Sequence, residues 1–181
     1  MEKIVTEQVP VLYGEKVLVR RFTPADINEV YIGWLNDPEV VRYSHQRFLR
    51  HDVETSLRYL ASFNGTDNLF MSIHALSDNR QIGTMTAYRF RHHGTVDVGI
   101  MIGDRSVWGK GYGQDAWNTF TGWLLSQKEI RKLTAGTSSL NYGMIKLIER
   151  SGMTFEAVRK AQEIFDGQVA DILYYAKFRT S

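Results

Sequence analysis

Cysteine is absent from the chain, and its absence excludes several kinds of chemistry. A disulfide scaffold, a thiolate nucleophile and a cysteine-based zinc or iron–sulfur site all need a cysteine thiol, which this sequence lacks. Long apolar runs are also missing, because no segment approaches the roughly 20 residues that a membrane-spanning helix needs. The N-terminal stretch carries acids and lacks a continuous apolar core, unlike a secretory signal. We therefore expect a cytoplasmic protein with no membrane partner.

A large excess of one charge is missing as well. Lys and Arg total 22 against 20 for Asp and Glu, which gives a formal net charge of +2. This excess is too small for a typical nucleic-acid-binding domain, so we expect no nucleic-acid partner. The chain has 181 residues, 43% of them hydrophobic, and we expect residues 1–181 to form a single domain.

Hydrophobic periodicity and turn residues predict an α/β (mixed α+β) fold in layers, without regular βα alternation. The first helix should be capped by Thr23, and the second should turn Val53, Leu57 and Leu60 inward. Helices are expected at 23–35, at 52–63, directly after 104–113 and at 141–151. Strands are expected at 16–22, 69–76, 81–89, 95–102, 132–137 and 153–161, followed by a hairpin of 163–165 with 169–178 about Asp166-Gly167.

Three alternating glycines, Gly109, Gly111 and Gly113, lie between an expected strand and an expected helix. Glycine permits a positive φ and lets backbone amides approach a ligand closely. The helix that follows presents unpaired N–H groups and a partial positive charge, so the segment is typical of an anion-binding turn. A glycine-rich turn without a ligand is the alternative.

Two common phosphate motifs do not match this segment. A Walker loop needs Ser or Thr after Gly-Lys, whereas Gly111 follows Gly109-Lys110 here. A Rossmann fingerprint needs Gly-x-Gly-x-x-Gly, and the spacing here is one residue shorter. A nucleotide-binding module is therefore disfavoured.

The segment resembles the GNAT superfamily of acyl-CoA N-acyltransferases, whose pattern is Gln/Arg-x-x-Gly-x-Gly/Ala. The matching residues are 97–102, then Trp108-Gly-Lys-Gly-Tyr-Gly113, which is similar to the branch of ribosomal-protein alanine and spermidine acetyltransferases. A second family motif, Asn with a downstream Gly-Phe, corresponds to Asn141 with Gly152-Met153, where Met replaces Phe. Further similar segments are Val19-Arg20-Arg21-Phe22, Trp34-Leu35-Asn36-Asp37-Pro38 and the closing hairpin.

The resemblance implies a central, mostly antiparallel twisted sheet with a splayed strand pair, flanked by about four helices. It also implies acetyl-CoA as the acyl donor, with its pantetheine arm between strands 97–102 and 132–137 and its pyrophosphate on the glycine turn. No metal is needed. The implied cofactor-binding residues are Ile100, Met101, Ile102, Trp108, Gly109, Lys110, Gly111, Tyr112, Gly113, Gln114 and Asn141.

The resemblance implies the catalytic residues less directly than the cofactor-binding residues. Asp97 is the candidate base, because many relatives carry Glu at the matching strand position; the alternative is an edge-strand acid that faces solvent. Relatives place a proton-donating Tyr seven residues after the Asn, but Ile148 stands there. Tyr142, Ser138, Ser139 or water remain as candidates to protonate the thiolate, and Tyr142 at a helix start is alternatively structural.

The segment 42–51 is basic, and in relatives the region between the first two helices lines the acceptor side. Arg42, Tyr43, His45 and Arg47 are therefore candidate substrate-binding residues for a phosphate-bearing acceptor. A solvated basic loop is the alternative. A polyamine would prefer an acidic wall, so the segment weakly disfavours one.

We therefore expect an N-acetyltransferase that moves an acetyl group from acetyl-CoA to a primary amine by direct transfer. The acceptor is either a protein α-amine or a small amine such as an amino-sugar nucleotide. A non-catalytic CoA-binding sensor with the same fold is the alternative. Exposed strands near the C-terminal hairpin also suggest a homodimer.

Overall fold

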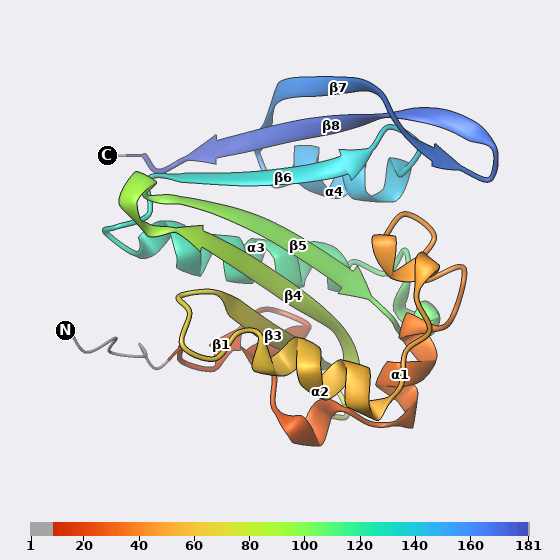
Figure 1. Cartoon of the computed structure of the whole chain (residues 1–181). Helices are drawn as coiled ribbons and strands as arrows, with labels where there is room; N and C mark the ends of the chain where they lie inside the picture. Colours follow the sequence, from red (N-terminus) through yellow and green to blue (C-terminus); the bar gives the residue numbers. More distant parts are fainter. Residues whose placement is uncertain (1–8, 181) are drawn as a thin grey trace.

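A twisted eight-stranded sheet forms the centre of the computed structural model, which describes residues 9–180 (Figure 1). The strands are β1 (Leu12–Tyr13), β2 (Val17–Arg21), β3 (Leu69–Ala75), β4 (Gln81–Phe90), β5 (Thr95–Ile102), β6 (Lys132–Ser138), β7 (Thr154–Phe165) and β8 (Gln168–Phe178). Their order across the sheet is β1-β2-β3-β4-β5-β6-β8-β7. Only β5 and β6 pair in parallel, so the predicted mixed fold with a mostly antiparallel sheet is confirmed.

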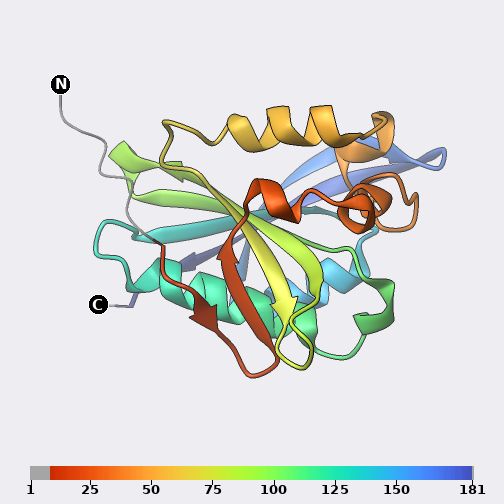
Figure 2. The ribbon, with the colours of Figure 1, turned by 90° about the horizontal axis from the view of Figure 1, so that it is seen from below.

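Helices cover both faces of the sheet (Figure 2). The α-helices are α1 (Glu29–Leu35), α2 (Val53–Ala61), α3 (Tyr112–Ser126) and α4 (Tyr142–Arg150). Short 3-10 turns are η1 (Pro24–Asp26), η2 (His45–Phe48), η3 (Arg91–His93) and η4 (Arg105–Val107). One face carries α1 and α2, and the other carries α3 and α4. None of the helices in residues 9–180 has the length and apolar character needed to span a membrane.

The larger core lies between the sheet and α3. Trp117, Phe120 and Leu124 are fully buried there, as the helical spacing predicts. The opposite face carries a smaller aromatic cluster, in which the rings of Phe22 and Phe63 stack on Phe70 with centroids 4.2 and 5.3 Å away. Two packed faces fix α1 and α2 on one side of the sheet and α3 on the other.

The strands β5 and β6 separate after a short paired stretch. Their parallel register joins Thr95, Val96 and Asp97 to Lys132, Leu133 and Thr134, and no pair follows. Figure 1 shows the two strands diverging from this point. Beyond Asp97, β5 still pairs with β4 as far as Ile102, so its other edge is open.

Two sequence predictions about the first helices are wrong. Thr23 and Asp26 form a capping box on η1, and α1 begins later, where the Asn28 side chain accepts the N–H of Tyr31. In α2, Val53 and Leu57 are 52% and 42% exposed instead of buried, whereas Leu60 packs against the smaller aromatic cluster as predicted. Since Tyr59 and Phe63 pack on Phe70, the helix turns Ser56 and Tyr59 toward the sheet.

The C-terminal hairpin turns at Asp166-Gly167 as predicted. Both residues have positive φ, +51° and +79°, which suits a two-residue hairpin turn. The two expected strands 153–161 and 163–165 are one strand, β7, because register shifts absorb the irregularity between Arg159 and Glu163. The tip of this hairpin reaches the segment between α1 and α2.

Candidate active site

Two cavities meet at the open edge of β5. The first, which we call the splay cavity, has a volume of about 660 Å³ and is lined by Glu39, Val40, Arg42, Tyr43, Ser44, Ile100, Met101, Ile102, Val107, Trp108, Gly109, Gly111, Gly113, Gln114, Asn141, Gly143, Met144, Lys146, Leu147 and Arg150. The second, the helix-side cavity, has a volume of about 540 Å³ and lies under α1 and α2. Ser44, Ile100 and Met101 line both.

The glycine turn forms one end of the splay cavity. Gly109 and Gly111 have φ of +72° and +87°, which side-chain-bearing residues rarely adopt. Gly111 is the N-cap of α3, and no side chain caps that helix. The first N–H groups of α3 therefore remain available to an anion. Trp108 holds the turn against β5, since its Nε1 donates to the Ile102 carbonyl at 2.8 Å.

Most of the predicted cofactor-binding residues line the splay cavity together. The exceptions are Lys110 and Tyr112. The Lys110 carbonyl accepts a hydrogen bond from Lys16 Nζ at 3.0 Å, and Lys16 also lies 5.6 Å from the centroid of the Tyr112 ring. Asn141 is the N-cap of α4, and its Oδ1 accepts the N–H of Met144 at 3.2 Å.

Asp97 lies where β5 and β6 begin to separate. Its Oδ1 accepts a hydrogen bond of 2.8 Å from Thr134 Oγ1. Burial raises the pKa of Asp97 above its ordinary value, and the hydrogen bond from Thr134 opposes this rise. Asp97 does not line either cavity, but strand alternation puts it on the same face as Gly99, which lines the helix-side cavity. A carboxylate with a raised pKa at this point can take up a proton through a bridging water.

The other two candidate catalytic side chains lie outside both cavities. Tyr142 begins α4 and is 68% exposed. Ser138 is buried, and its hydroxyl accepts the N–H of Leu140 at 3.2 Å. Tyr142 and Ser138 both belong to the connection between β6 and α4, so a structural role suits their positions.

The basic segment between α1 and α2 contacts the β7–β8 hairpin, whose tip is acidic. Arg42 pairs with Asp166 at 3.1 Å and His45 with Glu163 at 2.9 Å. The Arg47 guanidinium stacks 4.3 Å from the Phe165 ring centroid. Arg42 and His45 therefore have acidic partners within the chain, whereas Arg47 contacts an aromatic ring.

Only two of the four candidate substrate-binding residues line a cavity. Arg42 and Tyr43 line the splay cavity, whereas His45 and Arg47 line neither cavity. The same segment does reach the helix-side cavity, but through Ser44, Gln46 and three residues after η2.

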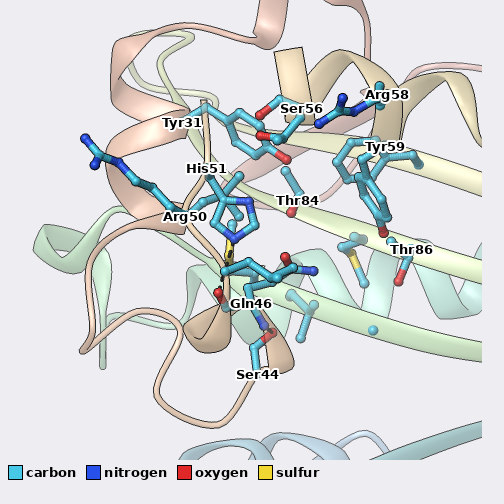
Figure 3. A pocket seen from close by; sticks show the side chains of 18 residues that line it. Tyr31, Ser44, Gln46, Arg50, His51, Ser56, Arg58, Tyr59, Thr84 and Thr86 are labelled. Carbon is cyan, nitrogen blue, oxygen red and sulfur yellow. Dashed lines mark hydrogen bonds between the residues drawn. The ribbon is translucent and has the colours of Figure 1, made fainter. Parts of the chain in front are cut away.

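Sequence reasoning missed most of the helix-side cavity, which α1, α2, β4 and β5 build together (Figure 3). Its lining residues are Tyr31, Leu35, Ser44, Gln46, Leu49, Arg50, His51, Thr55, Ser56, Arg58, Tyr59, Phe70, Thr84, Met85, Thr86, Gly99, Ile100 and Met101. One signal was present: Thr84 and Thr86 alternate with buried Met85, which indicates a polar surface on one face of β4. Burial raises the pKa of both Tyr31 and Tyr59, so these phenols stay protonated.

A family model for the GNAT acetyltransferase domain matches residues 16–154. The chain belongs to the GNAT acetyltransferase family. This places it among enzymes of the acetyltransferase class, as the glycine turn and Asn141 predict. No curated protein matches the sequence closely enough to be significant.

Solved structures with the same fold are distant from this GNAT chain in sequence. The ribosomal L7/L12 α-N-protein acetyltransferase in complex with CoA has a TM-score of 0.79 and 15% identity, over 94% of this chain and 97% of that one. The microcin C7 self-immunity acetyltransferase, in complex with acetyl-CoA and AMP, has a TM-score of 0.79 and 16% identity, over 94% of this chain and 98% of that one. Spermidine N-acetyltransferase from Vibrio cholerae, in complex with CoA and spermine, has a TM-score of 0.80 and 13% identity, over 91% of this chain and 96% of that one. These likenesses establish the fold.

Proposed function

We propose that this GNAT chain transfers an acetyl group from acetyl-CoA directly to a primary amine. The observation that carries the proposal is the meeting of the two cavities at Ile100 and Met101. A thioester that enters from one cavity and an amine that enters from the other would come together there, beside the open edge of β5.

The splay cavity supports the donor role. Unpaired N–H groups at the start of α3 suit the pyrophosphate of CoA, as helix N-termini suit phosphates generally. The open edge of β5 offers main-chain donors and acceptors to the amides of the pantetheine arm, and Asn141 lies on the opposite wall. Lys146 and Arg150 add positive charge to the same cavity.

The transfer step forms one N–C bond and breaks one C–S bond. The amine nitrogen attacks the thioester carbonyl, whose oxygen takes up negative charge beside the backbone N–H groups near Met101 and Ile102. Collapse of this intermediate releases the CoA thiolate. Asp97 accepts the proton lost by the amine, through water, and water protonates the thiolate. The chain has no cysteine thiol to carry the acetyl group, which fits direct transfer.

Acetyl-CoA should stabilise the folded protein. A ligand that binds only the native state adds about 2.7 kcal/mol at 100 times its dissociation constant. Isothermal titration calorimetry and a thermal shift measure this. A chain that binds no CoA at millimolar concentration would overturn the proposal.

A CoA-binding sensor without catalysis is the second candidate, because Ile148 stands where relatives carry the proton-donating Tyr. The two functions differ in one readout. The enzyme releases free CoA thiol when an amine is supplied, whereas the sensor binds acetyl-CoA and releases none.

A further inference from the structure

The permanently charged side chains that line the helix-side cavity are cationic. Arg50, His51 and Arg58 line it, and among residues 9–180 no Asp or Glu does. Glu54 pairs with Arg58 at 2.9 Å, but it lies outside the lining and is largely exposed. A solvent-exposed pair of this kind contributes little, so the guanidinium stays available to an anion.

A buried hydroxyl in the same wall has no partner. Ser56 on α2 is 3% exposed, and its Oγ makes no hydrogen bond within the described part of the chain. Burying an unsatisfied hydroxyl is unfavourable, and protein structures rarely leave one without a reason. A ligand that fills the cavity would supply the missing partner.

The remaining walls suit a small organic molecule. Tyr31, Tyr59 and Phe70 present aromatic surface, and Thr84 and Thr86 add hydroxyls from β4. A volume of about 540 Å³ lies within the usual range of roughly 300–1,000 Å³ for small-molecule sites. In Figure 3, Ser56 and Arg58 lie together at the α2 side of this group, whereas the Arg50 guanidinium extends away from it.

We propose that the helix-side cavity binds a small primary amine that also carries an anionic group, with Arg58 facing the anion. Ser56 Oγ bonds a polar group of the same molecule. This assignment rests on the proposed acetyl transfer and specifies its acceptor. A polyamine is disfavoured, because it carries several positive charges and the cavity lining contains arginines and no acid.

The test follows CoA thiol release with matched amines. One pair is glucosamine and glucosamine 6-phosphate, which isolates a phosphate; the other is 2-phenylethylamine and phenylalanine, which isolates a carboxylate. Spermidine and a short peptide with a free N-terminus complete the panel. We expect at least one anion-bearing member to exceed its neutral partner by about tenfold or more in kcat/KM, the scale of a charge-assisted hydrogen bond.

Two variants locate the effect. Arg58→Gln should reduce kcat/KM for the preferred anionic amine by about 10- to 100-fold while leaving its neutral partner unchanged. Arg91→Gln is the matched control, because Arg91 is exposed at η3 and lines neither cavity. Ser56→Ala should raise the KM of the anionic amine without lowering Tm, because it removes no protein hydrogen bond.

Each failure has a distinct signature. Equal rates within both pairs, faster turnover of spermidine or the peptide, or an unchanged anion preference in Arg58→Gln would overturn the acceptor assignment. So would acetyl-CoA binding without acetylation of any anion-bearing amine. If acetyl-CoA itself raises no Tm, the proposed function fails as well.

Discussion

Two carboxyl groups in this protein have pKa values shifted in opposite directions, because their surroundings differ. Asp26 is buried beside a cation, whereas Asp97 is half-buried and contacts only a neutral hydroxyl. The pKa of Asp26 is lowered by its cationic partner, whereas burial raises the pKa of Asp97. Asp26 is therefore suited to a structural role, and Asp97 is suited to the base role that we propose for it.

The stability of the chain should depend on Asp26. Burial alone would raise the pKa of Asp26, but the His74 ring 3.7 Å away and hydrogen bonds from Arg20 and Thr23 hold it well below the ordinary value. A carboxyl with a lowered folded-state pKa contributes stability above about pH 4, and this contribution is lost as the pH falls. Asp26→Asn should cost about 2–3 kcal/mol at pH 7, since it leaves a half-buried Arg20 unpaired.

Urea unfolding at pH 7 and pH 3 measures this effect. The difference between Asp26→Asn and the parent protein should shrink at the lower pH. The control is Asp78→Asn, which removes an exposed carboxylate paired with Arg80 and should leave stability unchanged. A pH-independent difference would refute the account of Asp26.

The activity should depend on Asp97 and on its hydrogen bond. Asp97→Asn should lower kcat/KM by about 10²- to 10⁴-fold, the usual contribution of a general base. Thr134→Val removes the hydrogen bond that lowers the pKa of Asp97, so the acid limb of the pH–rate profile should move to higher pH. An Asp97→Asn enzyme with full turnover, or a Thr134→Val profile that moves to lower pH, would contradict the base role.

At the scale of the element, the start of α3 is the feature that the sequence specifies best. Glycines with positive φ lead into a helix whose first turn has no side-chain cap. Glycines with positive φ and an uncapped helix start both lower the stability of the folded chain. Binding of the proposed pyrophosphate group at this helix start would offset that cost.

Replacing Gly109 should separate binding from folding. A Cβ at Gly109 meets no atom within 4 Å, but φ of +72° strains any larger residue by about 1 kcal/mol. Gly109→Ala should therefore lower Tm slightly and weaken acetyl-CoA binding strongly, as calorimetric titration would measure. Gly122→Ala, in the middle of α3 with equally open space, should raise Tm and leave binding unchanged. Equal binding by both variants would argue against the glycine turn as the pyrophosphate site.

At the scale of the whole molecule, the site joins elements that are far apart in sequence. The glycine turn, the open edge of β5 and Asn141 were predictable, because each follows from a local motif and its resemblance to a family. The helix-side cavity was not, because Tyr31, Ser56 and Thr84 come together only when α1 and α2 pack on the sheet. The acidic partners of the basic segment, Glu163 and Asp166, were not predictable either, since they lie more than 100 residues away. The expected homodimer stays a prediction.

Direct transfer requires both substrates to be bound at once, one in each cavity. Initial-rate kinetics test this most directly, with acetyl-CoA and the best amine of the panel both varied and CoA thiol release followed. We predict intersecting double-reciprocal lines, which indicate a ternary complex. Parallel lines, the pattern of a covalent acetyl-enzyme, would contradict the account.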